Sequence, residues 1–373
     1  MTPALYIGLI SGTSRDGLDA ALVDLSQEHP RLLKAACTPY PESLRAELDH
    51  LLDLGRRPQT AECMGLDMAL GGFFADACQG LLDDAGQSAS AVMAIGSHGQ
   101  TVWHEPNGPD PVSLQIGNAE VLSRQTGLTV VSDFRSADLA LGGQGAPLAP
   151  LLHRGLFGRL APCAVLNLGG IANLTLLEPD GAVSGFDTGP ANCLLDSWCL
   201  SRRGEPFDDD GAWAASGQVL TELLEQWLED PYFALPTPKS TGLEHFNRSW
   251  LAQRLQGDEA PEDVQRTLMA LTVESVAQAL ERHATLAGPV LVCGGGVHNG
   301  FLMRELAARL PDRTVESTQA HGIDPDWVEA VLFAWLAQQR LADQLQDTAP
   351  ITGARAPALL GRVTPAPETG AYA

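Results

Sequence analysis

The sequence predicts an α/β protein built from two halves, and three features lead to this prediction. The chain has 373 residues, which is long enough for two domains with sizeable cores. Residues 4–25 and 164–177 repeat one pattern, in which two apolar strands flank a turn of glycine and small polar residues. Elsewhere, short apolar runs alternate with segments of helical periodicity, as is typical of α/β folds.

The composition restricts the classes of partner. A formal net charge of −23 repels nucleic acid and anionic membranes, so we expect neither as a partner. The seven cysteines include no Cys-x-x-Cys pair, which fits a reducing compartment and argues against a zinc ribbon. The sequence shows no N-terminal signal and no apolar run of membrane-spanning length, so we expect a cytoplasmic protein.

The first repeat has the features of a phosphate-binding hairpin. Its turn, residues 11–17, is rich in glycine and hydroxyl residues, and successive N–H groups in such a turn form an anion-binding concavity. Thr13 and Ser14 add hydroxyl donors, and Asp16 and Asp19 are suited to face a cation. Taken alone, the stretch fits an ordinary polar hairpin turn better, and only the rest of the chain favours the phosphate site.

The first half continues with helices and short strands that end in polar residues. Helices are expected at 41–54, 61–85 and 119–125, and strands at 91–95, 114–117 and 128–131. His98 follows the strand expected at 91–95. It is either a general base or a hydrogen-bonded structural histidine, and the residues favour the structural role. Arg135 follows the strand expected at 128–131. It either binds a carboxylate or phosphate of a ligand, or it forms an ion pair at the surface. The glycine-rich loop 142–148 opens a further helix but does not match a P-loop.

The second repeat reinforces the first. Strands at 164–168 and 171–177 flank the turn Gly169-Gly170, and Asn167 and Asn173 supply amide donors. Two α/β halves that each present such a hairpin to a shared cleft can hold one nucleotide from both sides. Repetition of the hairpin is more informative than either copy.

Asp187 is the leading candidate for a general base. A strand beginning at residue 183 is expected to deliver it into a turn, with Pro190 in the first turn of a helix that runs through Trp198. A carboxylate at a strand end beside a glycine-rich loop suits that role. The alternative is that Asp187 only caps the following helix, and the flanking pattern favours catalysis.

The remainder of the second half holds further glycine and acidic positions. Expected elements are an amphipathic segment at 213–228, a loop at 235–247, a helix at 261–286, a strand after Gly288, a helix to Leu310, a strand at 312–315 and a helix within 322–339. The loop contains Lys239, one of only two lysines, and is expected to contact nucleotide or substrate. The triple glycine 294–296 lets a nucleotide lie against backbone, although Asn299 breaks the dinucleotide fingerprint. Glu329 faces either solvent or the cleft.

Ten motifs, in order and over nearly the whole chain, resemble the anhydro-N-acetylmuramic acid kinases: GLISGTSRDGLDA, IGSHGQTVWHEP, LQIGN, DFRSAD, GGQGAPL, LNLGGIANLT, GFDTGPAN, DGAWAASGQV, PKSTGLEHFN and VCGGGVHN. The resemblance implies the two-domain sugar kinase, Hsp70 and actin superfold, with a cleft between the domains. This agrees with the two hairpins. Arg15 and Ala191 depart from the family pattern, which has leucine and commonly glycine there, and Arg15 could alter the grip on the nucleotide.

The resemblance also implies an activity. It is the ATP- and Mg²⁺-dependent conversion of 1,6-anhydro-N-acetylmuramate to N-acetylmuramate 6-phosphate in bacterial cell-wall recycling. The expected partner is the amino sugar, and we expect a homodimer. Domain I is expected at residues 1–140, with the tail 347–373 packed on it, and domain II at 141–346 with the second hairpin and both catalytic carboxylates.

The expected site residues combine the family pattern with the two hairpins. The catalytic carboxylates fall on Asp187 and Glu329. Expected nucleotide contacts are Gly12, Thr13, Ser14, Arg15, Asp16, Gly17, Leu18, Asp19, Asn167, Gly169, Gly170, Gly294, Gly295 and Gly296. Expected substrate contacts are His98, Gln100, Arg135, Gly189 and Asn192. No set of protein metal ligands is expected.

The implied chemistry needs one water at the anomeric carbon and a phosphate acceptor at O6. Opening the anhydro bridge releases O6 next to the γ-phosphate, so one carboxylate that activates one water serves both steps. Two other classes remain: a scaffold ATPase of the same fold and a non-enzymatic, sugar-responsive regulator. The pair Asp187 and Glu329 argues against the first, and the intact hairpin and acidic charge argue against the second.

Overall fold

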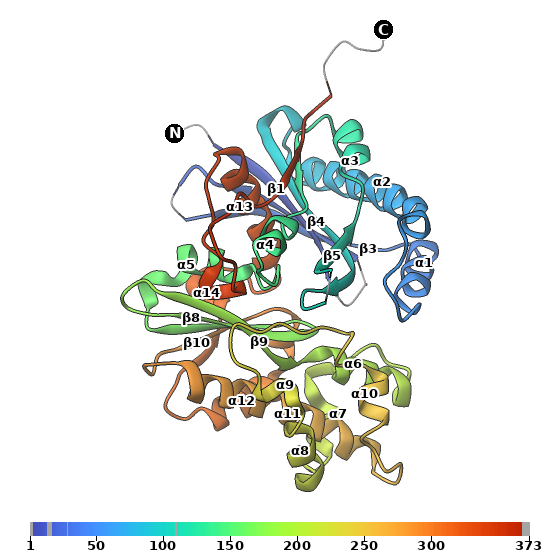
Figure 1. Cartoon of the computed structure of the whole chain (residues 1–373), viewed down its shortest axis with the longest axis vertical. Helices are drawn as coiled ribbons and strands as arrows, with labels where there is room; N and C mark the ends of the chain where they lie inside the picture. Colours follow the sequence, from blue (N-terminus) through green and yellow to red (C-terminus); the bar gives the residue numbers. More distant parts are fainter. Residues whose placement is uncertain (1–2, 13–16, 28, 109, 368–373) are drawn as a thin grey trace. The chain divides into compact units, whose positions relative to one another are not determined.

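The chain divides into two compact units (Figure 1). The computed structural model describes residues 3–12, 17–27, 29–108 and 110–367. Unit 1 comprises Met1–Leu156 and Trp327–Ala373, and unit 2 comprises Phe157–Asp326. Each unit holds one mixed sheet, and these sheets confirm the predicted α/β class.

The sheet of unit 1 is built around β1, which is buried along its whole length. The order is β12-β6-β4-β1-β2-β3, with β5 paired to β4, and β1 is antiparallel to β2 but parallel to β4. The strands are β1 Leu5–Ser11, β2 Gly17–Asp24, β3 Arg31–Pro39, β4 Val92–Glu105, β5 Val112–Ile116, β6 Val130–Ser132 and β12 Arg362–Thr364.

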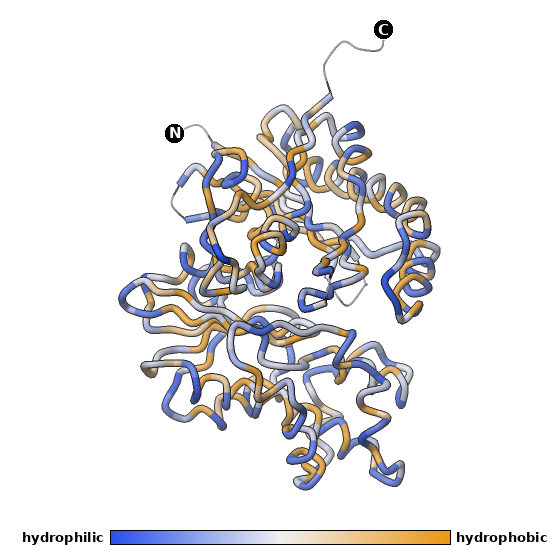
Figure 2. The backbone as a smooth tube through the Cα atoms, in the orientation of Figure 1, coloured by the Kyte–Doolittle hydropathy of each residue, from blue (hydrophilic) through white to orange (hydrophobic). Residues whose placement is uncertain are grey.

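Among the helices of unit 1, α2 and α13 pack most extensively against this sheet, and hydrophobic and hydrophilic stretches alternate along the helices (Figure 2). They are α1 Glu42–Leu52, α2 Thr60–Ala85, α3 Ala119–Thr126, α4 Ser136–Ala140, α5 Ala149–Phe157, α13 Val328–Leu341 and α14 Ala349–Thr352, with the 3₁₀ turn η1 Ala89–Ala91. Phe74 of α2 is fully buried in the core that the strands line with Ile7 and Leu9.

The sheet of unit 2 has the order β11-β10-β7-β8-β9 and packs against the long, largely buried helix α11. Its strands are β7 Cys163–Leu168, β8 Ile171–Leu177, β9 Val183–Pro190, β10 Val290–Cys293 and β11 Val315–Ser317. Its helices are α6 Asn192–Arg203, α7 Ala212–Ser216, α8 Thr221–Leu228, α9 Pro231–Ala234, α10 Arg248–Ala252, α11 Pro261–His283 and α12 Gly300–Arg309, with the 3₁₀ turns η2 Gly158–Leu160, η3 Asp209–Gly211, η4 Gly295–His298 and η5 Thr318–His321.

The repeat expected from the sequence extends beyond the hairpins. In each unit three consecutive strands form an antiparallel meander, β1-β2-β3 in unit 1 and β7-β8-β9 in unit 2. In each unit a later strand then pairs in parallel with the first strand of the meander, and a further strand pairs in parallel with that one. In unit 1 these are β4 and β6, and in unit 2 they are β10 and β11. The two units therefore share one topology.

The unit boundaries differ from those expected at residues 140 and 346. Loop 142–148 belongs to unit 1 because the buried Asp138 binds it: its Oδ2 accepts a hydrogen bond of 2.7 Å from the N–H of Gly145. Helix α13 also belongs to unit 1, because it lies so close to β1 that a Cβ on Gly8 would stand 1.8 Å from the carbonyl oxygen of Ala330. This helix carries Glu329, which was expected in the second domain. The tail joins the same unit through β12, which pairs with β6.

Two local expectations were wrong. β4 does not stop at residue 95 but runs to Glu105, because β5 pairs with its second half. Pro190 ends β9 rather than starting a helix, and α6 begins at Asn192. The amphipathic segment 213–228 forms two helices, α7 and α8, which are separated at Gly217, where a Cβ would lie 2.2 Å from the carbonyl oxygen of Glu262.

The close approach of α13 to β1 predicts an asymmetric response to two alanine substitutions. Gly8→Ala should lower the free energy of unfolding by about 1–3 kcal/mol or more, because the added methyl group meets backbone that cannot yield. Gly65→Ala, on α2 with nothing within 4 Å, should raise it by roughly 0.5–1 kcal/mol. Urea unfolding measures both values, and equal stability of Gly8→Ala and the unchanged chain would contradict this packing.

Candidate functional site

Three polar side chains form a row across the sheet of unit 2. Asn167 of β7 pairs in register with Asn173 of β8, and Asn173 pairs with Asp187 of β9. Residues directly opposite one another on neighbouring strands point to the same face of a sheet. Asn173 is half-buried, and its Oδ1 is a buried atom with no hydrogen-bond partner among the described residues. The row therefore gathers two amides and a carboxylate that a polar ligand can use.

Asp187 lies inside β9, next to a bulge, rather than in a turn after the strand. The register with β8 shifts between Ala172 and Asn173, so Thr188 is an extra residue on β9. Bulges re-aim neighbouring side chains and recur beside active sites. Asp187 is only 6% exposed. The structure thus holds a buried carboxylate at an irregular point of an otherwise regular sheet.

Main-chain and hydroxyl groups hold Asp187 in place. Its Oδ2 accepts a hydrogen bond of 2.9 Å from the N–H of Thr241, and its own N–H donates to the carbonyl oxygen of Lys239 at 3.0 Å. The hydroxyl of Tyr232 donates to the carbonyl oxygen of Asp187 at 2.7 Å. Segment 239–241 therefore fixes both the backbone and the carboxylate of this residue.

The alternative role for Asp187, a cap for helix α6, is wrong. The first residue before α6 is Ala191, and no side chain caps the helix there. Its first amides donate instead to the turn of the second hairpin: Ala191 and Cys193 to the carbonyl oxygen of Gly170, and Asn192 to that of Gly169. The side chain of Asn192 donates to Leu168 at 2.9 Å. These contacts bring Asn192 and the turn Gly169-Gly170 together next to the polar row.

The triple glycine contains two packing positions and one open position. A Cβ on Gly294 would lie 2.3 Å from Oδ1 of Asn167, and one on Gly296 would lie 2.6 Å from the Cβ of Leu168. A Cβ on Gly295 would meet nothing within 4 Å, and Gly295 is exposed. Gly294 and Gly296 are therefore required for the loop to approach β7, whereas Gly295 leaves space for a ligand beside backbone.

Gly189 also has a packing explanation. Its φ is +154°, and a Cβ there would lie 2.8 Å from the ring of Phe233. This close approach requires a glycine whether or not a substrate binds nearby.

In unit 1, Gln100 ties β4 to the end of the first hairpin strand. Its Oε1 accepts a hydrogen bond of 2.5 Å from Ser11, and its Nε2 donates to the carbonyl oxygen of Gly12 at 3.4 Å. Gln100 is 2% exposed, so it supports the hairpin from inside the unit. Thr13, Ser14, Arg15 and Asp16, at the centre of the expected phosphate site, lie outside the described residues.

The flank of the first hairpin is partly structural. Gly17 lies against β3, where a Cβ would be 2.4 Å from the carbonyl oxygen of Thr38. Leu18 is fully buried in the core of unit 1, so its side chain cannot reach a nucleotide. Asp19 is half-buried on β2.

His98 and Arg135 form one hydrogen-bonded pair. Nε of Arg135 donates to Nε2 of His98 at 3.0 Å, and the Arg135 NH1 group donates to the carbonyl oxygen of Gly145 at 2.6 Å. Burial, and then the charge of Arg135, hold the pKa of His98 well below its usual value. A neutral His98 therefore accepts this hydrogen bond and orients Arg135. This is the structural role that the sequence favoured for His98.

Glu329 is half-buried in the first turn of α13. It belongs to unit 1, while Asp187 belongs to unit 2. The two expected catalytic carboxylates are thus carried by different units.

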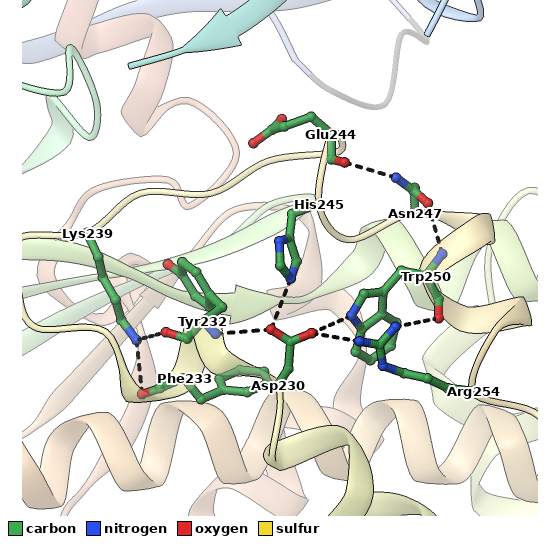
Figure 3. Close-up of polar contacts among 9 residues, drawn as sticks. All are labelled: Asp230, Tyr232, Phe233, Lys239, Glu244, His245, Asn247, Trp250 and Arg254. Atoms are coloured by element: carbon green, nitrogen blue, oxygen red, sulfur yellow. Dashed lines mark hydrogen bonds and ion pairs between the residues drawn. The ribbon is translucent and has the colours of Figure 1, made fainter. Parts of the chain in front are cut away.

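Sequence reasoning missed the residues that hold Asp187. Tyr232 lies on the short helix α9, and no pattern marked it. Lys239 was conspicuous only as one of two lysines, yet it is buried and donates to the carbonyl oxygens of Tyr232 and Phe233 at 3.0 and 3.3 Å (Figure 3). Figure 3 also shows that the buried Asp230 accepts hydrogen bonds from the N–H of Tyr232, from His245, from Trp250 and from Arg254, and so anchors α9.

Within the described ranges, no three histidine, cysteine or carboxylate side chains gather in a way that could hold a metal ion. Of the helices that the structure describes, none combines the length and the apolar character that crossing a membrane requires.

Comparison with known proteins identifies the family. A family model described as anhydro-N-acetylmuramic acid kinase matches residues 4–366. Similar relatives are the anhydro-N-acetylmuramic acid kinases of Xanthomonas campestris pv. campestris (strain 8004), 50% identical over 97% of both chains, and of Pasteurella multocida (strain Pm70), 46% identical over 96% of both chains. Among solved structures, the chain is similar to the activator of the 2-hydroxyisocaproyl-CoA dehydratase from Clostridium difficile with bound ADPNP, at a TM-score of 0.45 and 11% identity over 92% of this chain and 98% of that one. The family match and the identity over nearly the full length show that this protein belongs to the anhydro-N-acetylmuramic acid kinase family and is an enzyme of the kinase class.

Proposed function

We propose that this enzyme uses ATP and one water to convert 1,6-anhydro-N-acetylmuramic acid to N-acetylmuramic acid 6-phosphate, as a step in cell-wall recycling. Family membership supports the sugar and the kinase reaction. The observation that carries the mechanism is the buried Asp187, held by main-chain groups beside a bulge. A fixed carboxylate in such a place suits a general base.

The proposed reaction forms two bonds and breaks two bonds. Asp187 takes a proton from the water, and the water oxygen forms a bond to the anomeric carbon C1. The bond between C1 and O6 breaks, and O6 forms a bond to the γ-phosphorus as ADP leaves. One base therefore serves both bond-making steps, since opening the bridge creates the phosphate acceptor. Glu329 is proposed as the second active-site carboxylate, and its half-burial leaves part of the side chain accessible.

The glycine loops are proposed to bind the nucleotide. Open space at Gly295 fits a ligand lying against backbone, and Asn167 lies beside the same loop. Residues 12–19 are proposed to hold the phosphates. Mg²⁺ would neutralise the phosphate charge.

Arg135, which His98 orients, and Asn192 are the proposed substrate contacts. Gln100 and Gly189 have structural explanations, which reduces the support for direct substrate contact at these two positions. A homodimer and a cytoplasmic location remain predictions.

The open position in the triple glycine predicts a selective loss of ATP affinity. Gly295→Ala should weaken ATP binding about tenfold or more without loss of stability, because the methyl group occupies ligand space and meets no protein atom. Gly158→Ala is the matched control, since Gly158 also begins a 3₁₀ turn of unit 2 with nothing within 4 Å. Isothermal titration calorimetry with a non-hydrolysable ATP analogue measures both, and unchanged affinity in Gly295→Ala would remove Gly295 from the nucleotide site.

The base role predicts loss of turnover in Asp187→Asn. This variant keeps the shape of the side chain and should reduce kcat by on the order of 10²–10⁴-fold or more, since both bond-making steps depend on the base. ADP release with and without the anhydro sugar measures turnover. Sugar-dependent ADP release in the unchanged enzyme supports the proposed function, whereas ADP release that does not depend on sugar would favour the scaffold ATPase.

A further inference from the structure

Lys239 closes a ring of contacts around Asp187. The lysine ammonium donates to the carbonyl oxygens of Tyr232 and Phe233 at the end of α9 and lies 4.4 Å from the centre of the Tyr232 ring. The Tyr232 hydroxyl donates to Asp187, and Asp187 donates back to the main chain of Lys239. Two residues further, Thr241 supplies the N–H that binds the carboxylate. All of these residues belong to unit 2.

Helix α9, which carries Tyr232 and Phe233, is itself held by Asp230 and Arg282. Asp230 is 5% exposed and accepts the N–H of Tyr232 at 3.0 Å, which fixes the start of α9. Arg282 of α11 donates to the carbonyl oxygen of Phe233 at 3.1 Å, so this carbonyl group binds two cations. The ammonium of Lys239 therefore connects helix α9 to the loop that holds Asp187.

We propose that Lys239 is a positioning residue for Asp187: its ammonium fixes loop 238–241 against α9, so that the N–H of Thr241 holds the carboxylate oriented toward its water. The inference rests on the proposed function, which gives Asp187 the role of base. Lys239 itself touches neither substrate nor water in this account. Its effect on the reaction passes through the loop, and a shift of about 1 Å in a catalytic group can cost on the order of 10²-fold in rate.

The charges around Lys239 make its effect depend on pH. Burial, and next the charge of Arg282, lower the pKa of Lys239 to about 8, while Asp187 acts in the opposite direction. The pKa of the neighbouring His283 is lowered, first by burial and then by Lys239, so that this histidine adds little positive charge at neutral pH. Burial raises the pKa of Tyr232, so its hydroxyl stays protonated. The ammonium is thus present at neutral pH and is lost as the pH rises through about 8.

Replacement of Lys239 tests the positioning role, because a merely structural role would not change the pH dependence of kcat. Lys239→Met should lower kcat at pH 7.5 by about 10- to 100-fold, with the KM for the sugar within about threefold, and should show no further loss between pH 7.5 and 9.5. In Lys239→Arg the cation persists, since arginine stays charged, so kcat should recover to within a few-fold and should not fall above pH 8. The unchanged enzyme should lose activity above about pH 8.

Lys34 provides the matched control. It is the other lysine of the chain, lies on β3 of unit 1 and pairs with Asp84 at 3.5 Å. Lys34→Met should leave kcat and its pH profile unchanged. Because the chain has two lysines, labelling lysine with ¹³C at Cε gives two side-chain NMR signals, which Lys34→Met assigns. The Lys239 signal should titrate near pH 8.

The outcomes separate this inference from the function it rests on. If Asp187→Asn loses turnover but Lys239→Met keeps the kcat and pH profile of the unchanged enzyme, Lys239 does not position the base. The same follows if Lys239→Arg loses activity above pH 8 as the unchanged enzyme does. If Asp187→Asn turns over normally, the base assignment itself fails, and the positioning role falls with it. Circular dichroism confirms that each variant is folded.

Discussion

The hydrogen bond from the main-chain N–H of Thr241 to the carboxylate of Asp187 is the constraint on which the site depends. A carboxylate that is 6% exposed needs a donor to offset the loss of water, and here a backbone amide supplies it. A main-chain donor can be in place only if its loop is in place. The position of Asp187 therefore depends on α9, on the hydrogen bonds of Asp230 and on Lys239.

Glycines serve two physical purposes in this chain, and their surroundings separate them. Gly8 lets α13 approach β1, and Gly294 and Gly296 let a loop lie against β7, so these positions would be glycine with or without a ligand. Gly295 has no such neighbour, and its lack of a side chain is unexplained by packing. The space around a glycine thus distinguishes a structural position from a proposed ligand contact.

The sequence predicted the fold well where the pattern was local. Both hairpins and the long helices follow from apolar periodicity and glycine turns, whereas the strands β3 and β12 were not predicted. The unit boundaries could not be predicted in this way, because α13 joins unit 1 through close backbone contact between Gly8 and Ala330, which are far apart in the sequence.

The candidate site was predictable in its residue types but not in its contacts. Asp187, Asn167 and the glycine loop were found from their neighbours in the chain, and cross-strand register brings Asn167, Asn173 and Asp187 into one row. Tyr232 and Thr241 reach Asp187 only through folding of an irregular loop, and periodicity carries no information about such contacts. The pairing of His98 with Arg135 likewise joins two segments that the sequence treats separately.

The central claim is that Asp187 directs one water to the anomeric carbon while the phosphoryl group passes to O6. The most direct measurement is the reaction in ¹⁸O-labelled water, with mass spectrometry of the sugar phosphate before and after removal of the phosphate. The account predicts one ¹⁸O atom on C1 of the sugar and none on the phosphate. Label on the phosphate, or a product without label on C1, would contradict it.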